Sequence, residues 1–190
     1  MAGIKEIRLC GFGGQGIVLA GAILGHAVVK DGQWVAESNS YGAAARGGNC
    51  KADVIISDSP IIFPRVIKAD ILIAMYQSAY EKCIADVKEN GIVIYDEQFV
   101  SPGENGDLKH VGIPATRAAV TELNNRQVAN IVILSAAVEA TGIISKEALL
   151  SAVKEDVPER FLDLNLKAID VGGKLGIEAV QANRRLEEGS

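Results

Sequence analysis

Apolar and charged side chains alternate along residues 4–10, and this segment runs directly into Gly11. A period of two is typical of a strand, and the glycine after it indicates a tight turn. Residues 16–30 are dense in Ala, Leu and Ile, and Asp31 and Gly32 close the stretch with turn chemistry. The pattern therefore predicts a strand, a glycine turn and a helix in succession.

Further along the chain, residues 33–37 have the pattern of a second strand, and residues 38–51 form a polar, glycine-rich segment that we expect to be a loop. Residues 52–57 and 69–75 are continuous apolar runs, as in buried parallel or central strands. A helical spacing over residues 77–90 ends at Gly91, and residues 92–95 form another strand. This alternation predicts an α/β domain with a mostly parallel sheet.

From Asn124 onward the chain is helical in character. Ile131, Leu134 and Val138 share one helix face, Ser145 is placed to cap a second helix, and Pro158 opens a third. The expected fold is Rossmann-like, a mostly parallel sheet flanked by helices with a helical C-terminal cover. With 190 residues, 48% hydrophobic and 23% charged, one domain spanning residues 1–190 is expected.

Composition narrows the possible functions. Acidic residues outnumber basic ones by 24 to 19 for a net charge of −5, so the electrostatic footprint of a nucleic-acid-binding protein is missing. The three cysteines have no CxxC spacing and form an odd set, which suits a reducing cytoplasm better than a disulfide framework. With only two histidines besides, we expect no metal site on this chain.

Residues 11–29 carry no charge and follow two basic residues, so a signal peptide or a membrane span has to be considered. Six glycines, Gln15 and His26 interrupt the stretch, and Glu6 lies where a cationic end would be needed. The apolar core over residues 17–24 is too short to cross a bilayer. We expect no membrane span.

The first candidate site is the turn between the first strand and the first helix. Its G-x-G-x-x-G pattern lets the backbone approach a ligand closely, and a helix N-terminus with about half a positive charge favours an anion such as a phosphate. Glu37, 21 residues after Gly16, occupies the place of the ribose-binding acid of dinucleotide folds. NAD or FAD binding is one interpretation, and glycines that merely let the helix pack on the sheet are the other. The candidate residues are Gly11, Gly13, Gly14, Gln15 and Gly16.

The second candidate site is the glycine-rich segment after the second strand. If both segments leave the carboxyl ends of neighbouring strands, they flank one crevice, where open α/β sheets bind ligands. One interpretation is that the guanidinium of Arg46 binds a carboxylate or phosphate there, and the other is that Arg46 is a surface residue in a loop. No residue is assigned a catalytic role. The candidate residues are Ser40, Tyr41, Gly42, Arg46, Gly47 and Gly48.

Several segments together resemble the gamma subunit of 2-oxoacid:ferredoxin oxidoreductases, over nearly the whole chain. They are IRLCGFGGQGIVLAG, SYGAAARGG, ADILIAM, NIVILSAAVEATGIIS and FLDLNLKAIDVG. In that family the second segment commonly has the pattern S-Y-G-P-E-x-R-G-G, so Ala43 and Ala44 replace the usual Pro and Glu. The domain expected over residues 1–190 is accordingly the pyruvate/ketoisovalerate oxidoreductase gamma type.

The resemblance implies a cytoplasmic enzyme of several chains that oxidatively decarboxylates a 2-oxoacid, with 2-oxoglutarate favoured. Coenzyme A is the co-substrate, and acyl-CoA, carbon dioxide and reduced ferredoxin are the products. Thiamine diphosphate, magnesium and 4Fe-4S clusters are expected on alpha, beta and delta-type partner subunits, so that this chain alone holds no cofactor. A stand-alone NAD- or FAD-dependent oxidoreductase and a non-catalytic assembly subunit stay open as alternatives.

The resemblance and the glycine motif lead to opposite expectations for nucleotide binding by the isolated chain. We predict that it does not bind NAD(H) or NADP(H) at physiological levels, despite Gly11, Gly13, Gly16 and Glu37. Calorimetric titration tests this, and a micromolar or tighter dissociation constant would favour the dehydrogenase interpretation.

Overall fold

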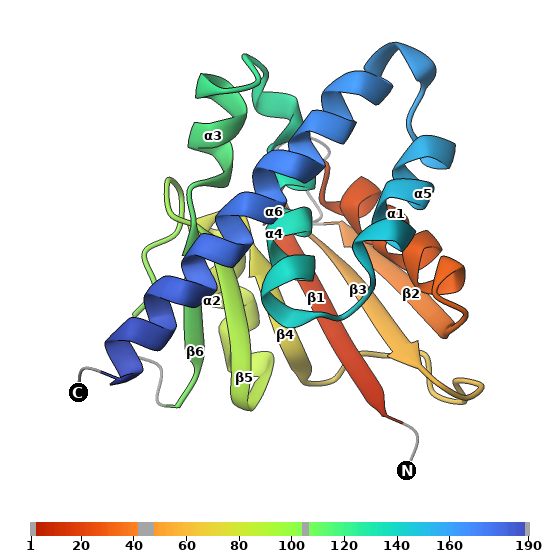
Figure 1. The fold of residues 1–190 in the computed structure, drawn as a ribbon. Helices are drawn as coiled ribbons and strands as arrows, with labels where there is room; N and C mark the ends of the chain where they lie inside the picture. The colour runs from red at the N-terminus through yellow and green to blue at the C-terminus, as the bar shows by residue number, and fades with distance from the viewer. Residues whose placement is uncertain (1–2, 42–47, 104–106, 189–190) are drawn as a thin grey trace.

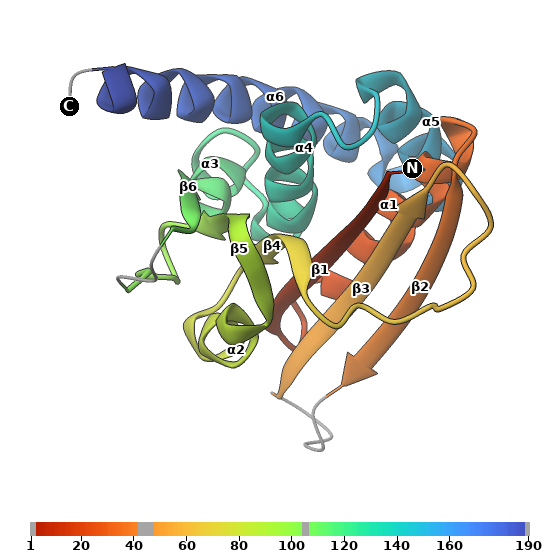
Figure 2. The same cartoon turned by 90° about the horizontal axis from the view of Figure 1, so that it is seen from below.

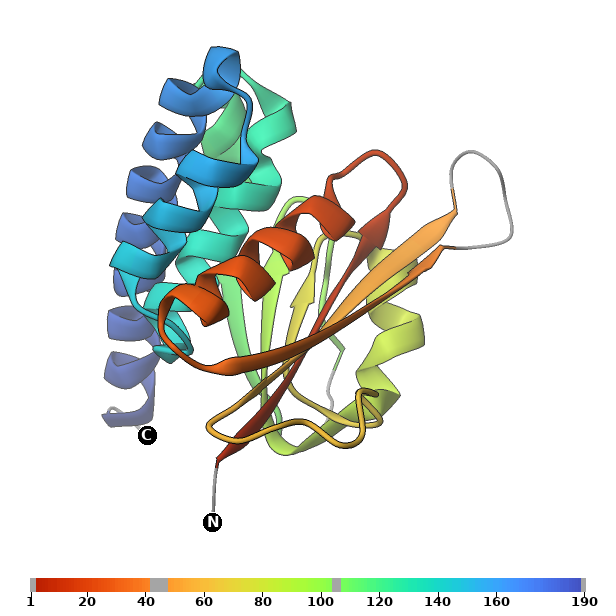
Figure 3. The ribbon, with the colours of Figure 1, turned by 90° about the vertical axis from the view of Figure 1, so that its right-hand side faces the viewer.

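The computed structural model describes residues 3–41, 48–103 and 107–188, which form layers around one sheet (Figure 1, Figure 3). One face of the sheet is covered by α1 (Ile17–Lys30) and α4 (Ala129–Thr141), with α5 (Lys146–Asp156) and α6 (Glu159–Glu188) outside them. The opposite face is covered by α2 (Gln77–Cys83). The smaller helical elements are η1 (Ile84–Asp86), α3 (Ala115–Thr121) and η2 (Arg126–Val128).

The sheet has its strands in the order β2-β3-β1-β4-β5-β6. The strands are β1 (Ile4–Phe12), β2 (Trp34–Tyr41), β3 (Asn49–Ser57), β4 (Ala69–Ala74), β5 (Val87–Asp96) and β6 (Lys109–Ile113). The pairs β1 with β4, β4 with β5 and β5 with β6 are parallel, whereas β3 is antiparallel to β1 and β2. The predicted α/β fold, a mostly parallel sheet with a helical C-terminal cover, is confirmed.

Strand β1 lies between β3 and β4, and its side chains enter two cores. Ile7 and Leu9 join the larger core beneath α1 and α4, while Cys10 joins a smaller core beneath α2. Arg8, one of the charged residues of the alternating pattern, is only 2% exposed. Both faces of β1 are therefore buried, and its one central charge has to be paired inside the protein.

The partner of Arg8 is Asp53 on β3. The Arg8 Nε and Nη2 atoms donate to the two carboxylate oxygens at 2.7 and 2.9 Å, and Nη2 also donates to the Val66 carbonyl at 2.9 Å. Nη1 lies 3.0 Å from the Asp86 carboxylate. The hydrogen bonds that Arg8 donates to the Asp53 carboxylate raise the pKa of Arg8. This buried pair fastens β1 to β3 and to the segment between β3 and β4.

Helix α1 packs on β3 and β2 through two glycines one turn apart. A Cβ on Gly21 would lie 2.6 Å from the Cβ of Ala52, and one on Gly25 would overlap the carboxylate of Glu37. This glycine face therefore lets α1 approach the sheet closely.

The expected loop over residues 38–51 is wrong at both ends. Residues 38–41 complete β2 and pair with residues 50–53 of β3, from Ser38 opposite Asp53 to Tyr41 opposite Cys50. Because β2 is an edge strand with exposed side chains, it accepts the polar sequence that suggested a loop. Strands β2 and β3 thus pair over more residues than the sequence pattern predicts.

Two other boundaries also differ from the sequence-based expectation. The helix predicted over residues 77–90 ends at Cys83, and Gly91 lies inside β5 rather than capping a helix. Val87 has the spacing expected of a helix, but it pairs with Ala69 and is 7% exposed. Burial against the neighbouring strand therefore overrides the local helical pattern. In addition, α3 forms before residue 124, where no helix was expected.

The three predicted C-terminal helices are confirmed as α4, α5 and α6. The Ser145 hydroxyl accepts a hydrogen bond from the Ala148 N–H at 3.1 Å, and Pro158 directly precedes α6. Helix α4 is sandwiched between α6 and the sheet (Figure 2), so it is buried on all sides. Gly172 and Gly176 bring α6 against the α4 backbone. Across the described ranges, no helix combines the length and apolarity that a membrane crossing needs.

Two glycines on α6 provide a matched test of this packing. A Cβ on Gly176 would lie 2.5 Å from the Ala136 carbonyl oxygen, whereas one on Gly173 would meet nothing closer than 3.6 Å. We predict that Gly176→Ala lowers the free energy of unfolding by about 1–3 kcal/mol through overpacking. Gly173→Ala should raise it by about 0.5–1 kcal/mol because alanine is the better helix former. Urea unfolding of both variants measures the difference, and equal effects would contradict the packing argument.

Candidate functional site

The turn between β1 and α1 needs glycine at several positions. Gly14 and Gly16 have φ angles of 96° and 73°, in the left-handed region that L side chains rarely adopt. Position 11 needs glycine for a different reason: a Cβ there would lie 2.7 Å from the Gln15 Oε1 atom and from the Ile17 side chain, so no larger residue fits. Gly11, Gly14 and Gly16 therefore have structural roles whatever the turn binds.

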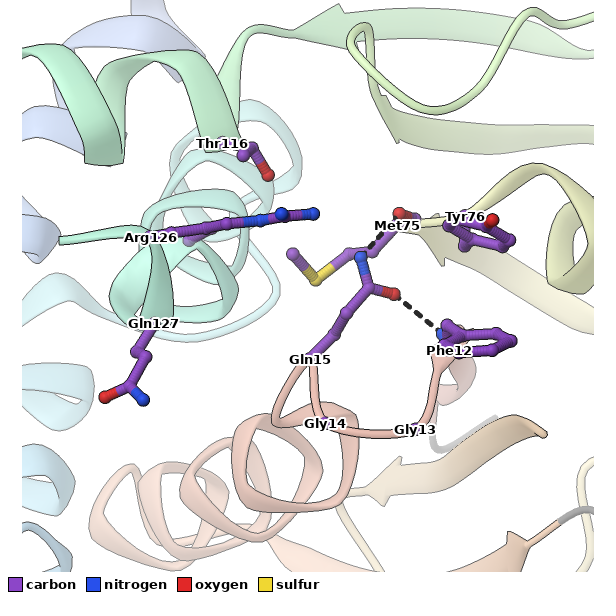
Figure 4. A pocket seen from close by; sticks show the side chains of 10 residues that line it. Phe12, Gly13, Gly14, Gln15, Met75, Tyr76, Thr116, Arg126 and Gln127 are labelled. Carbon is purple, nitrogen blue, oxygen red and sulfur yellow. Dashed lines mark hydrogen bonds between the residues drawn. The ribbon is translucent and has the colours of Figure 1, made fainter. Parts of the chain in front are cut away.

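The Gln15 side chain joins the carboxyl ends of β1 and β4. Its Oε1 atom accepts a hydrogen bond from the Phe12 N–H at 2.7 Å, and its Nε2 atom donates to the Met75 carbonyl at 3.0 Å (Figure 4). Asn130 on α4 holds the other end of the turn, since its Nδ2 atom donates to the Gly16 carbonyl at 3.1 Å. The turn is thus fixed from the sheet and from the helical cover.

A cavity of about 280 Å³ opens beside this turn (Figure 4). It lies where β1 and β4 end, and the chain leaves β1 for α1 on one face and β4 for α2 on the other. Such a switch point is the usual ligand crevice of an open α/β sheet. The lining residues are Phe12, Gly13, Gly14, Gln15, Met75, Tyr76, Thr116, Arg126, Gln127 and Ala129.

Arg126 brings a positive charge to this cavity. Its side chain extends from η2 toward Met75, between Thr116 and Gln15 (Figure 4). The guanidinium lies 5.0 Å from the centroid of the Phe99 ring, a cation–π arrangement. Phe99 is in turn 6.2 Å from Tyr76, whose ring lies 5.0 Å from that of Phe12. The cavity therefore combines an exposed cation, aromatic surfaces and a glycine turn, a set suited to a phosphate-bearing ligand with an aromatic base.

Sequence reasoning missed Arg126. The local signal for it was the Asn124-Asn125 turn, in which the Asn125 side chain accepts the Gln127 N–H at 2.8 Å and starts η2. Nothing local indicated that this turn faces a loop more than 100 residues earlier in the chain.

The second candidate site is only partly described. Ser40 and Tyr41 end β2, and the Gly48 carbonyl accepts a hydrogen bond from the Gly13 N–H at 2.9 Å. Gly42, Arg46 and Gly47 lie outside the described residues. The premise that the two strands are neighbours is wrong, because β3 lies between β1 and β2. The bond between Gly13 and Gly48 nevertheless brings the two segments to the same edge of the sheet.

The dinucleotide interpretation is not supported by the position of Glu37. This residue lies in the middle of β2, where it pairs with Val54 and packs over Gly25, two turns into α1. Burial raises the pKa of Glu37. A ribose-binding acid would instead have to end a parallel strand directly beside β1, and the strand beside β1 on that side is the antiparallel β3.

Two of the three cysteines meet in the fold although they lie far apart in the sequence. Cys10 and Cys83 are buried in the same small core, and the interaction between their thiols raises the pKa of Cys10 and lowers that of Cys83. Cys50 lies on the other face of the sheet, and its Sγ atom is 3.6 Å from the Gly11 carbonyl oxygen. Within the described ranges, no three His, Cys, Asp or Glu side chains gather as metal ligands.

Comparison with known proteins gives a consistent family assignment. The model of the pyruvate ferredoxin/flavodoxin oxidoreductase family matches residues 6–175. Among curated proteins, the 2-oxoglutarate synthase subunit KorC of Methanocaldococcus jannaschii is 46% identical over 92% of this chain and 95% of its own length.

Solved structures agree with this assignment. The gamma subunit of a keto/oxoacid ferredoxin oxidoreductase from Geobacter sulfurreducens matches with a TM-score of 0.85 and 40% identity, over 93% of this chain and 98% of that one. The 2-oxoglutarate:ferredoxin oxidoreductase from Magnetococcus marinus, with 2-oxoglutarate, coenzyme A and succinyl-CoA bound, matches with a TM-score of 0.84 and 25% identity. That match covers 92% of this chain and 31% of the longer one.

Gly16 and Gly14 allow the turn geometry to be tested. Both have positive φ, but a Cβ on Gly16 would overlap the Asn130 side-chain amide, while one on Gly14 would meet no atom within 4 Å. We predict that Gly14→Ala costs about 1–2 kcal/mol, the strain of a left-handed alanine. Gly16→Ala should cost at least about 1 kcal/mol more, because it also disturbs the Asn130 hydrogen bond. Thermal unfolding of both variants gives the comparison, and equal losses would show that Asn130 does not constrain the turn.

Proposed function

The chain belongs to the pyruvate ferredoxin/flavodoxin oxidoreductase family, and we propose that it is the gamma-type subunit of a multi-subunit 2-oxoacid:ferredoxin oxidoreductase. The substrate we favour is 2-oxoglutarate, which is supported by the names of the Methanocaldococcus relative and the Magnetococcus structure. The complex would oxidatively decarboxylate the 2-oxoacid, transfer the acyl group to coenzyme A and pass the released electrons to ferredoxin.

In this proposal residues 1–190 form a single gamma-type domain that works in the cytoplasm with alpha, beta and delta-type subunits. Thiamine diphosphate, magnesium and the 4Fe-4S clusters belong to those partners and supply the decarboxylation and electron-transfer chemistry. The donor set of this chain is in keeping with that division, since its three cysteines lie on two faces of the sheet. No catalytic residue is assigned to this chain.

The chain itself would contribute to binding coenzyme A. The observation that carries this proposal is the cavity at the carboxyl ends of β1 and β4, where Arg126, aromatic rings and the N-terminal end of α1 come together. Coenzyme A carries phosphates on an adenosine, and a guanidinium and a helix N-terminus attract the phosphates while rings can stack on the base. The coenzyme A in the Magnetococcus structure supports the choice of ligand.

The proposed binding residues include those expected from the sequence. The first group forms the turn: Gly11, Gly13, Gly14, Gln15 and Gly16. The second group belongs to the hairpin end: Ser40, Tyr41, Gly42, Arg46, Gly47 and Gly48. Their proximity is supported by the hydrogen bond from the Gly13 N–H to the Gly48 carbonyl, and Arg46 would add a second cation for the ligand.

Coenzyme A kinetics of the assembled complex test this function. We predict that Arg126→Ala raises the coenzyme A concentration for half-maximal rate by about 10- to 150-fold, because a charge-assisted contact is worth about 1.5–3 kcal/mol. Arg46→Ala should act in the same direction. Arg117→Ala is the matched control, since this exposed arginine on α3 does not line the cavity and should leave the kinetics unchanged.

The outcome also separates the proposal from its alternatives. A complex that assembles with Arg126→Ala and Arg46→Ala and keeps wild-type coenzyme A kinetics would identify this chain as an assembly subunit. Turnover by the isolated chain with a nicotinamide or flavin cofactor would favour a stand-alone oxidoreductase instead.

A further inference from the structure

Asp96 is fully buried at the carboxyl end of β5, and it does not line the cavity. Its carboxylate accepts hydrogen bonds from the backbone N–H groups of Gln98 and Thr116, both at 3.1 Å, and from the Thr116 hydroxyl. A buried carboxylate is retained only where donors compensate for its lost hydration, and these donors come from two separate segments.

Each of these two segments carries a residue of the candidate site. The first is the turn after β5, in which the Asp96 carbonyl accepts hydrogen bonds from Phe99 at 3.1 Å and Val100 at 3.0 Å. This turn holds the Phe99 ring under Arg126. The second is the start of α3, where Thr116 lines the cavity.

We propose that Asp96 is a positioning residue for the ligand cavity, which fixes Phe99 and thereby the guanidinium of Arg126. This inference rests on the proposed function only for its kinetic consequence. Arg126 is exposed, and an exposed arginine side chain has many rotamers. A fixed ring against the guanidinium restricts these rotamers before binding, so less conformational entropy is lost when Arg126 binds an anion. Asp96 acts through Phe99 and Thr116 and touches no ligand.

The first experiment measures the position of Arg126 without any ligand. In the NMR spectrum of the full-length, uncomplexed chain, the ring current of Phe99 should shift the Nε–H resonance of Arg126, and Phe99→Leu gives the resonance position without the ring. Asp96→Asn replaces one carboxylate oxygen, which accepts hydrogen bonds, with an amide group that donates them. The Phe99 ring should then lose its fixed position, and the Arg126 resonance of this variant should move most of the way to the Phe99→Leu position. Ser135→Ala is the control, since it removes a buried hydrogen bond from α4 to the Ile169 carbonyl and should leave the resonance in place.

The second experiment measures the assembled complex. Asp96→Asn should raise the KM for coenzyme A about tenfold, the equivalent of about 1.4 kcal/mol, while kcat stays within about twofold. A purely structural role would instead reduce the amount of assembled complex and leave its KM unchanged. Ser135→Ala should behave in that structural manner.

The outcomes separate this inference from the proposed function. If Asp96→Asn moves the Arg126 resonance but neither it nor Arg126→Ala changes the KM, Asp96 still positions Arg126 and the coenzyme A proposal fails. If Arg126→Ala raises the KM while Asp96→Asn changes neither the resonance nor the KM, the positioning role is overturned. Should Asp96→Asn not fold, Thr116→Val should move the resonance and Thr116→Ser, which keeps the hydroxyl, should restore it. Identical spectra for these two variants would also overturn the positioning role.

Discussion

The turn between β1 and α1 is the constraint on which the rest of the structure depends. Gln15 joins it to the end of β4, the Gly13 N–H joins it to the β2–β3 hairpin, and Asn130 joins it to α4. Each hydrogen bond is worth only about 1 kcal/mol net, so the position of the turn depends on several of them together. The turn therefore joins both halves of the sheet and the helical cover to one short backbone segment that needs glycine at positions 11, 14 and 16.

The cavity has two walls, which come from parts of the chain that lie far apart in the sequence. The first wall is the glycine turn, held in place by the ends of β1 and β4. The opposite wall comes from η2 and the start of α3, where Arg126 and Thr116 depend on contacts made through Phe99 and Asp96. In the proposed function, a backbone turn held by hydrogen bonds and a cation held over an aromatic ring would face the same ligand from opposite sides of the cavity.

The sequence predicted most of the elements and failed at specific boundaries for physical reasons. The apolar runs of β3 and β4, the glycine face of α1 and the Ser145 cap were predictable, because burial, close packing and capping each leave a local pattern. The sequence pattern predicts a helix end at Gly91, whereas β5 contains a bulge there, with Asn90 at a φ of 59°, which local periodicity does not predict. The polar residues at the end of β2 predict a loop, but they form a strand because the backbone of β3 supplies their hydrogen-bond partners.

By itself the sequence determined the fold class, the glycine turn and the family, since periodicity and special backbone positions are properties of neighbouring residues. Only the tertiary structure decided that β3 separates β1 from β2, that Glu37 packs over Gly25 and that Arg126 faces the turn. These features arise from contacts between residues far apart in the chain, such as Asn130 with Gly16. Strand order and the meeting of distant loops depend on which elements bury one another's surfaces, and no local pattern encodes that choice.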